Sequence, residues 1–241
     1  MVHRRWEDDF ARWEKARGEP VCEVDLEADR MLRDRLTALD PEAGWFSEET
    51  ADSAERLLRV RAWVVDPIDG TRDFLRGRNG WAVSIALVEG GRLRLGVLDA
   101  PARGEHWRAE AGKGATRNGV VLRCGARATL AGARVPADVL PQADTDLVPV
   151  ARPNSIALRI AMVAANEADL LAAIRWGHEW DIAAAALIAQ EAGATVTDAL
   201  GRPLRYNSTR GEMFGVLATV PGIHDQAVER LASRAAIAVR R

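Results

Sequence analysis

The sequence predicts a mixed fold of the α/β or α+β class, because helical and strand patterns alternate along the chain. Apolar residues recur at helical spacing over residues 24–39 and 182–192. Short apolar runs bounded by turn residues, a pattern typical of strands, occupy residues 62–65, 81–88, 93–100 and 194–197. The 241 residues are enough for one large domain or two closely joined ones.

The N-terminal segment, residues 3–17, is expected to form a short helix. Trp6, Phe10 and Trp13 are spaced by four and three residues, which places them on one helical face. Gly18 is expected to end this helix.

Three further helices are expected. The helix over residues 24–39 should stop at Asp40, which precedes a proline. Residues 156–171 are also expected to be helical. The helix over 182–192 is followed by Gly193, a residue typical of the position just after a helix.

Turn residues indicate where the predicted strands end. The run over 62–65 should end at Asp66, because Pro67 has no N–H to donate to a neighbouring strand. Residues 81–88 and 93–100 flank a Glu-Gly-Gly-Arg turn and are expected to form a hairpin.

The domain organisation is suggested by a proline-containing stretch. Short apolar pieces alternate with prolines over residues 131–150. We therefore expect an N-terminal α+β subdomain over 1–130 and a C-terminal α/β subdomain over 131–241.

Composition excludes several classes of protein. The net charge of −2 and the lack of a basic stripe interleaved with aromatics argue against a nucleic-acid partner. Cys22 and Cys124 lie far apart, which disfavours a disulfide framework or a zinc site. The first residues have no apolar signal-peptide core, and the most apolar stretch, 182–189, is too short to insert into a membrane. A cytoplasmic protein is expected on these grounds.

The segment Asp-Pro-Ile-Asp-Gly-Thr at 66–71 is the strongest chemical signal. Asp66 and Asp69 face one another across a tight turn, and such like charges repel unless a cation lies between them. Magnesium prefers oxygen ligands, and the Ile68 carbonyl lies between the two carboxylates. Gly70 permits close approach of a ligand, and Thr71 offers a hydroxyl and an N–H to an anion. The alternative is an ordinary surface turn.

Other acidic residues are weaker signals when each is taken alone. Glu48 and Glu49 could be a solvated surface pair. Asp181 stands just before a predicted helix, where aspartate is common as an N-cap. Asp25 could be an exposed helical charge.

Taken together, these segments resemble the inositol monophosphatase superfamily. Its two long signatures are matched by WVVDPIDGTRDF at 63–74 and WDIAAAALIAQEAGA at 180–194. Its shorter elements are matched by PVCEVD at 20–25, SEET at 47–50, GVLDAPARGE at 96–105 and GKGATRNG at 112–119. The resemblance runs from about residue 15 to about residue 200.

The resemblance implies a layered αβαβα sandwich and a phosphatase that uses two or three magnesium ions and is inhibited by lithium. The implied metal ligands are Glu48, Asp66, the Ile68 carbonyl, Asp69 and Asp181. The implied catalytic residues, which would direct a metal-activated water at phosphorus, are Thr71, Asp25 and Glu48. The expected substrate contacts are Asp69, Gly70, Thr71, Ser155, Arg159 and Asp181.

This sequence departs from the family pattern in a few places. Cys22 stands where threonine is usual, Ser47 stands where glycine is frequent, and Gly193 is followed by alanine instead of a second glycine. The region before residue 15 is short. None of these departures removes an implied metal ligand.

The substrate is expected to be a small phosphate ester. SEET, the arginine of DGTRDF, WAVSIALVEGGRL and APARGE most resemble the bacterial bisphosphate nucleotidase branch, which removes the 3′-phosphate of 3′-phosphoadenosine 5′-phosphate. Arg159, Arg152 and Arg205 are candidates for a second phosphate. The alternatives are an inositol monophosphatase, a histidinol phosphatase, or a catalytically silent binding protein on the same fold. The resemblance leaves monomer and homodimer open.

Overall fold

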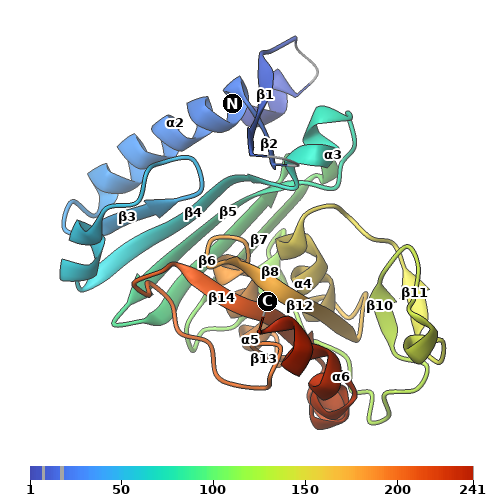
Figure 1. The fold of residues 1–241 in the computed structure, drawn as a ribbon. Helices are drawn as coiled ribbons and strands as arrows, with labels where there is room; N and C mark the ends of the chain where they lie inside the picture. The colour runs from blue at the N-terminus through green and yellow to red at the C-terminus, as the bar shows by residue number, and fades with distance from the viewer. Residues whose placement is uncertain (7–8, 17–18, 241) are drawn as a thin grey trace.

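A computed structural model describes residues 1–6, 9–16 and 19–240 and arranges them in five layers (Figure 1). Helix α2 (Glu23–Leu39) covers one face of a seven-stranded sheet, and α4 (Ile156–Ala164) and α5 (Ala183–Glu191) cover the other. A three-stranded sheet and then α6 (His224–Ala238) complete the stack. This αβαβα order confirms the expected mixed class and the layered sandwich.

The seven-stranded sheet has the strand order β3-β4-β5-β6-β7-β8-β9. Only β3 and β4 run parallel, and the other neighbours within this sheet pair antiparallel. The strands are β3 (Gly44–Ser47), β4 (Arg61–Asp69), β5 (Ala82–Glu89), β6 (Arg92–Ala100), β7 (Glu105–Glu110), β8 (Ala115–Arg117) and β9 (Val120–Val121). The pairing of β5 with β6 confirms the predicted hairpin.

The predicted end of the fourth strand was wrong. Strand β4 continues through Pro67 to Asp69, and its register against β5 shifts between Asp66 and Asp69. Proline is tolerated here because a bulge already interrupts the ladder of hydrogen bonds at this point. The bulge also sets the direction of the two aspartates, which become part of the site described below.

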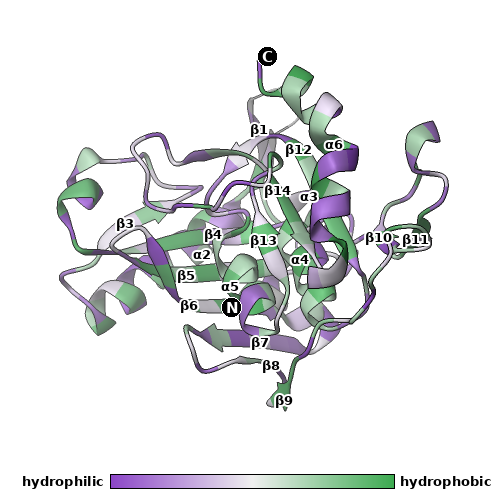
Figure 2. Ribbon diagram, turned by 90° about the horizontal axis from the view of Figure 1, so that it is seen from below, coloured by the Kyte–Doolittle hydropathy of each residue, from purple (hydrophilic) through white to green (hydrophobic). Residues whose placement is uncertain are grey.

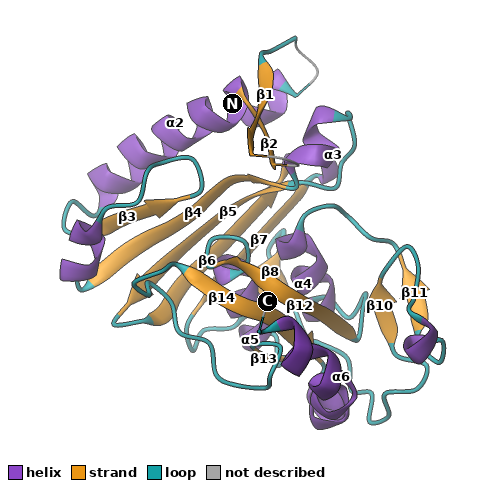
Figure 3. Ribbon diagram, in the orientation of Figure 1, coloured by secondary structure: helices purple, strands orange, loops and turns teal. Residues whose placement is uncertain are grey.

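The second sheet contains β12 (Leu170–His178), β14 (Glu212–Thr219) and β13 (Thr195–Thr197), in that order and all antiparallel. A short parallel pair, β10 (Arg134–Pro136) and β11 (Val148–Val150), stands apart from both sheets (Figure 3). The helix expected over residues 156–171 was too long, since α4 ends at Ala164 and β12 begins at Leu170. Asn166 takes a positive φ of 56°, which ends the helical conformation.

Short 3₁₀ helices link these elements within the described parts of the chain. They are η1 (Ala54–Leu58), η2 (Pro101–Arg103), η3 (Gln142–Asp144) and η4 (Pro221–Ile223).

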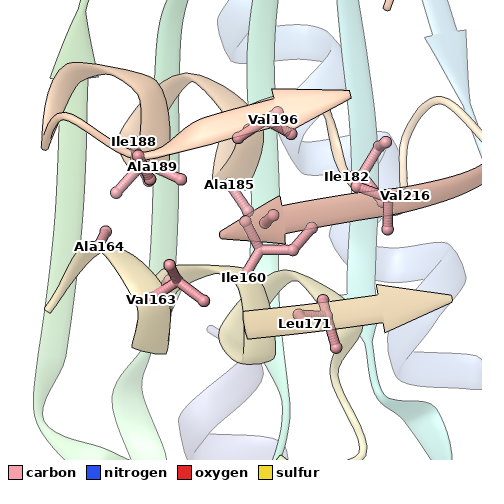
Figure 4. Close-up of a cluster of buried hydrophobic side chains, with 14 of the residues drawn as sticks. Ile160, Val163, Ala164, Leu171, Ile182, Ala185, Ile188, Ala189, Val196 and Val216 are labelled. Atoms are coloured by element: carbon pink, nitrogen blue, oxygen red, sulfur yellow. The ribbon is translucent and has the colours of Figure 1, made fainter. Parts of the chain in front are cut away.

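The main core lies between the two sheets around α4 and α5. Side chains of Ile160, Leu171, Ile182 and Val216 point toward one another there (Figure 4). Residues 183–189 of α5 are all buried, as expected of a helix enclosed on every side. Small alanines let this helix come close to the sheet, and a Cβ at Gly96 of β6 would lie 2.6 Å from the Ala184 carbonyl oxygen.

The outer helix α6 is amphipathic, with hydrophilic and hydrophobic turns visible in Figure 2. Ala227, Leu231 and Ala235 form its buried face. No helix among the described residues has both the length and the apolar character needed to cross a membrane. The largest buried cluster draws residues from both sides of position 130, and the proposed subdomain boundary there stays a prediction.

The helix expected over residues 3–17 was wrong where the structure describes the chain. Only α1 (Val2–Arg5) is helical, and β1 (Arg12–Ala16) pairs antiparallel with β2 (Glu19–Cys22). Residues 7–8 and 17–18, including the expected stop at Gly18, lie outside the described residues. The aromatic spacing instead serves packing: Trp6 contacts Trp81 and Phe10 contacts Phe74, with ring centroids 6.0 and 5.5 Å apart.

Candidate active site

The predicted metal ligands Glu48, Asp66, Asp69 and Asp181 meet at one cavity of about 510 Å³ beside the end of β4, whereas Asp25 does not line it. Its walls come from the loop after β3, the end of β4, the start of α3 (Thr71–Leu75), the start of α4, strand β12 and the turn before α5. The predicted residues on these walls are Glu48, Asp66, Ile68, Asp69, Gly70, Thr71, Arg159 and Asp181. Segments far apart in the sequence therefore supply one site.

The Asp66–Thr71 turn is buried, so the surface-turn alternative was wrong. Asp66 is 2 % exposed and Asp69 is 7 % exposed. The Ile68 N–H donates to Asp66 Oδ1 at 3.0 Å, and the Thr71 hydroxyl donates to the Ile68 carbonyl at 3.0 Å. Gly70 has a φ of 93°, and a Cβ there would lie 2.8 Å from the Gly80 carbonyl oxygen. Only glycine fits this turn without strain.

Asp69 is held at the N-terminus of α4. Its Oδ2 accepts hydrogen bonds from the Ser155 hydroxyl at 2.5 Å and from the Ala157 N–H at 2.7 Å. Ser155 is also the N-cap of α4, because its hydroxyl oxygen accepts from the Leu158 N–H at 2.9 Å. Ser155, predicted as a substrate contact, is fully buried behind Asp69 and is not on the cavity wall. It is placed to orient Asp69.

Asp181 does not cap the helix that follows it, so that alternative was also wrong. Helix α5 begins at Ala183, and its N-cap position is Ile182. Asp181 Oδ2 accepts from the His178 N–H at 3.1 Å, which leaves its Oδ1 without a hydrogen bond among the described residues. The carboxylate therefore presents a free oxygen to the cavity that it lines.

The pair Glu48 and Glu49 is not a solvated surface pair. The Glu49 side chain is 4 % exposed and the Glu48 side chain 32 %. Lys15 Nζ from β1 lies 2.5 Å from Glu49 Oε1 and 3.4 Å from Glu48 Oε1. Burial raises the pKa of Glu49 to about 7. Glu49 thus anchors the lysine, while Glu48 lines the cavity.

Asp25 is a buried residue of the first turn of α2 and not an exposed charge. Its Oδ2 accepts from the Cys22 N–H at 2.8 Å, and together the two residues form a capping box. Burial raises the pKa of Asp25 to about 6. Asp25 and Thr71 share no hydrogen bond among the described residues, so the assistance of Thr71 by Asp25 stays a prediction.

The ionised forms of the carboxylates in this cavity are destabilised by burial and by one another. Burial raises the pKa of Asp69 to about 6 and that of Asp181 to about 7, and in Asp181 the nearby charge of Asp69 adds to the rise. Burial, followed by the charges of Glu48 and Asp69, raises the pKa of Asp66 well above its usual range. A nearby cation would favour the ionised forms of all these groups.

The residues on the wall fit a hard divalent cation. The acidic donors are all oxygen atoms, the type that magnesium prefers, and no histidine or cysteine lines the cavity. Asp66 Oδ2 and Asp181 Oδ1 make no hydrogen bond within the described chain. Among the described residues, no three Asp, Glu, His or Cys side chains are already close enough together to hold a metal ion. Coordination would therefore require these carboxylates to turn toward a shared ion.

Arginines form the other charged part of the wall. Arg159 and Arg152 were predicted and line the cavity, whereas Arg205 is exposed and does not. Sequence reasoning missed Arg72 and Arg175 as wall residues. Arg72 stands in the matched motif and could have been found there. Arg175 carries no local signal, because its direction depends on a register shift in β12 between Ala173 and Trp176.

Glu179 is a buried support that sequence reasoning also missed. Its carboxylate accepts from the backbone N–H groups of Asn207 at 2.5 Å and Ser208 at 2.9 Å. Arg56 donates to the Asn207 side-chain oxygen at 2.6 Å and to the Ser208 carbonyl at 2.9 Å. This network ties the loop before β14 to the turn that carries Asp181.

Replacing Glu179 by alanine should therefore lower thermal stability. It would leave two partly buried N–H groups without partners, and the loss of a fully buried partner costs about 1–3 kcal/mol. Since 1 kcal/mol corresponds to about 2–4 °C in Tm for a chain of this size, we expect a fall of several degrees. Circular dichroism melting of Glu179→Ala beside the exposed-site control Glu229→Ala measures it. Equal Tm values in the two variants would show that the network contributes little.

The fold and the site together define a class of architecture, a layered αβαβα sandwich with a carboxylate-lined cavity. The inositol monophosphatase family model matches residues 1–232. The chain belongs to the inositol monophosphatase family and is a phosphatase of that family. Members of this family are generally magnesium-dependent.

Individual relatives carry different names. A fructose-1,6-bisphosphatase/inositol-1-monophosphatase of Thermotoga maritima is 35% identical over 192 residues, which cover 76% of this chain and 72% of the relative. The 3′(2′),5′-bisphosphate nucleotidase CysQ of Escherichia coli K12 is 32% identical over 203 residues, which cover 80% and 81%. The solved structure of the extragenic suppressor protein SuhB of Bartonella henselae superposes with a TM-score of 0.82 at 27% identity and covers 95% and 92%. Because relatives with different names are about equally identical to this chain, these sequence identities do not indicate which substrate it uses.

Proposed function

We propose that this phosphatase is a magnesium-dependent bisphosphate nucleotidase that removes the 3′-phosphate of 3′-phosphoadenosine 5′-phosphate. One observation carries the proposal. A single cavity combines four carboxylates, Glu48, Asp66, Asp69 and Asp181, with four arginines, Arg72, Arg152, Arg159 and Arg175. The carboxylates suit metal ions at the reacting phosphate, and the arginines suit a second phosphate.

Different residues of the cavity would bind the metal ions, bind the phosphate and orient the attacking water. Glu48, Asp66, Asp69, Asp181 and the Ile68 carbonyl would hold the metal ions. Bound magnesium would lower the pKa of a water molecule and offset charge on the phosphate. The Gly70 and Thr71 N–H groups would bind the phosphate oxygens, and the Thr71 hydroxyl would orient the attacking water. Asp25 would assist Thr71 in deprotonating that water, and Ser155 would hold Asp69 in place through its hydrogen bond.

Part of the β12 wall supports a nucleotide over an inositol phosphate. Ala172, Ala173 and Ile174 line this part of the cavity and offer no side-chain partner to a ring hydroxyl, whereas Arg175 of the same strand is a polar side chain of the wall. A hydroxyl buried without a hydrogen bond costs roughly 1–3 kcal/mol by protein mutational data. Inositol phosphate and histidinol phosphate remain the alternative substrates, and a silent binding protein is the alternative of a different class.

Parallel assays of phosphate release decide among these candidates. The purified chain is given magnesium and either 3′-phosphoadenosine 5′-phosphate, inositol 1-phosphate or histidinol phosphate. We expect the highest kcat/KM for the bisphosphate nucleotide. A preference for inositol 1-phosphate would overturn the substrate assignment, and no release from any of the three by the folded protein would favour the silent binding protein.

A further inference from the structure

A second cavity, of about 320 Å³, lies between the β10–β11 segment, β12 and α6. Most of its wall is apolar, including Val135, Leu140, Leu147, Leu171, Ile174 and Leu231. Val139 also lines it and is 84 % exposed. The volume is at the lower end of the range of about 300–1,000 Å³ that is typical of small-molecule sites.

This apolar cavity adjoins the catalytic cavity. Arg152, Arg159, Ala172 and Ile174 line both. These four residues are therefore the place where a ligand bound at the carboxylates would meet the apolar space.

Arg159 stands at the junction of the two cavities. Its guanidinium donates to the Asn154 carbonyl at 2.8 Å and to the Ser155 carbonyl at 3.2 Å. It makes no close ion pair with a carboxylate of the described residues, although the negative charges of Asp69 and Asp138 act on it from a greater distance. A planar guanidinium held in this way can bind a phosphate along its edge and stack on an aromatic ring with its face.

The charged groups at the α6 side of the apolar cavity already satisfy one another. Arg234 donates to both carboxylate oxygens of Asp144 at 2.6 and 2.9 Å, and Arg230 pairs with Asp146 in the same way at 2.6 and 3.0 Å. Each arginine uses two of its five N–H donors in these pairs. Along the apolar part of the wall a polyol would lose its bonds to water without replacement, whereas a flat heteroaromatic ring would gain apolar contact.

We propose that the apolar cavity is the base-binding subsite of this enzyme and receives the purine of a nucleotide whose phosphate lies at the carboxylates. The proposal rests on the proposed function, because it places the reacting phosphate in the catalytic cavity. The subsite would make base recognition a determinant of specificity that is separate from the metal site.

Filling the subsite tests this proposal. Ala137 lines the apolar cavity just after β10, and Ala131 lies on an exposed turn outside it. Binding of adenosine 5′-monophosphate and of ribose 5-phosphate is measured by calorimetry with magnesium present, for the original chain, Ala137→Trp, Ala137→Leu and the matched control Ala131→Trp. The two ligands differ only by the base.

We expect the original chain and Ala131→Trp to bind adenosine monophosphate at least about tenfold more tightly than ribose 5-phosphate, since stacking and burial of a base contribute on this scale. Ala137→Trp should lose this preference and Ala137→Leu should lose part of it, with the loss confined to the ligand that has a base. If Ala137→Trp does not fold, the Ala137→Leu measurement carries the test.

The outcomes separate the subsite from the proposed function. A folded Ala137→Trp variant that keeps the full preference would overturn the subsite, even if the original chain hydrolyses 3′-phosphoadenosine 5′-phosphate. No preference in the original chain would overturn it as well. A preference that Ala137→Trp removes, in a chain that does not hydrolyse this nucleotide, would support the subsite and reject the proposed substrate.

Discussion

Replacing Asp69 by asparagine is expected to lower kcat by at least about 10²–10³-fold, the loss known for removing one preorganised electrostatic group. The substitution removes a ligand charge while keeping the volume of the side chain. Its remaining oxygen can still accept from the Ser155 hydroxyl and the Ala157 N–H, so α4 should keep its position. The true loss should exceed this range, because groups that act as a unit are not additive.

A phosphate-release assay of Asp69→Asn measures the expected loss of kcat, and circular dichroism shows whether the variant keeps its fold. Asp225→Asn is the matched control, since it makes the same chemical change at an exposed position in the first turn of α6. The control should keep its turnover. A folded Asp69→Asn variant with near-normal turnover would remove Asp69 from the metal site.

Replacing Asp181 by asparagine is expected to stabilise the metal-free chain at pH 8 and to reduce its stabilisation by magnesium. The folded-state pKa of Asp181 is raised to about 7 by burial and by Asp69, from a usual value of 3.8. A group whose pKa is raised on folding binds more protons when folded, so it lowers stability as pH rises from about 4 to about 7. Asparagine carries no charge and removes this loss.

Thermal melting with EDTA and with excess magnesium, at pH 5 and at pH 8, tests this expectation. A tenfold change in a protonation equilibrium corresponds to about 1.4 kcal/mol, and 1 kcal/mol to about 2–4 °C in Tm. In EDTA, Asp181→Asn should therefore melt several degrees above the original chain at pH 8, with a smaller gap at pH 5. Added magnesium should raise the Tm of the original chain more than that of the variant. A variant less stable than the original chain in EDTA at pH 8 would contradict the assigned electrostatics.

The buried acidic turn that carries the predicted metal ligands could be found from the sequence because its signals are local. Two aspartates three residues apart, with a proline and a glycine between and after them, imply a tight acidic turn wherever the chain places it. The hairpin of β5 and β6 and the helices α2 and α5 also follow from spacing over neighbouring residues. Which residues share the cavity with this turn was known only through the family resemblance.

The supporting residues could not be predicted, because their partners are remote in sequence. Ser155 donates to a carboxylate 86 positions away, and Arg56 reaches Asn207 over 151 positions. Nothing in the local pattern around Glu179 indicates that it holds two N–H groups of a later loop. Such roles depend on which segments the layers bring together.

The sequence by itself determined the mixed fold class, the acidic turn at 66–71, the helices α2 and α5 and the hairpin of β5 and β6, because periodicity and turn chemistry act over a few residues. Only the tertiary structure decided that residues 12–16 are a strand, since pairing with β2 outweighs a helical spacing of aromatics. It also decided that β4 continues through Pro67 and that the apolar cavity adjoins the catalytic one. Strand pairing and cavity walls are contacts between distant segments, and these are settled only when the layers pack.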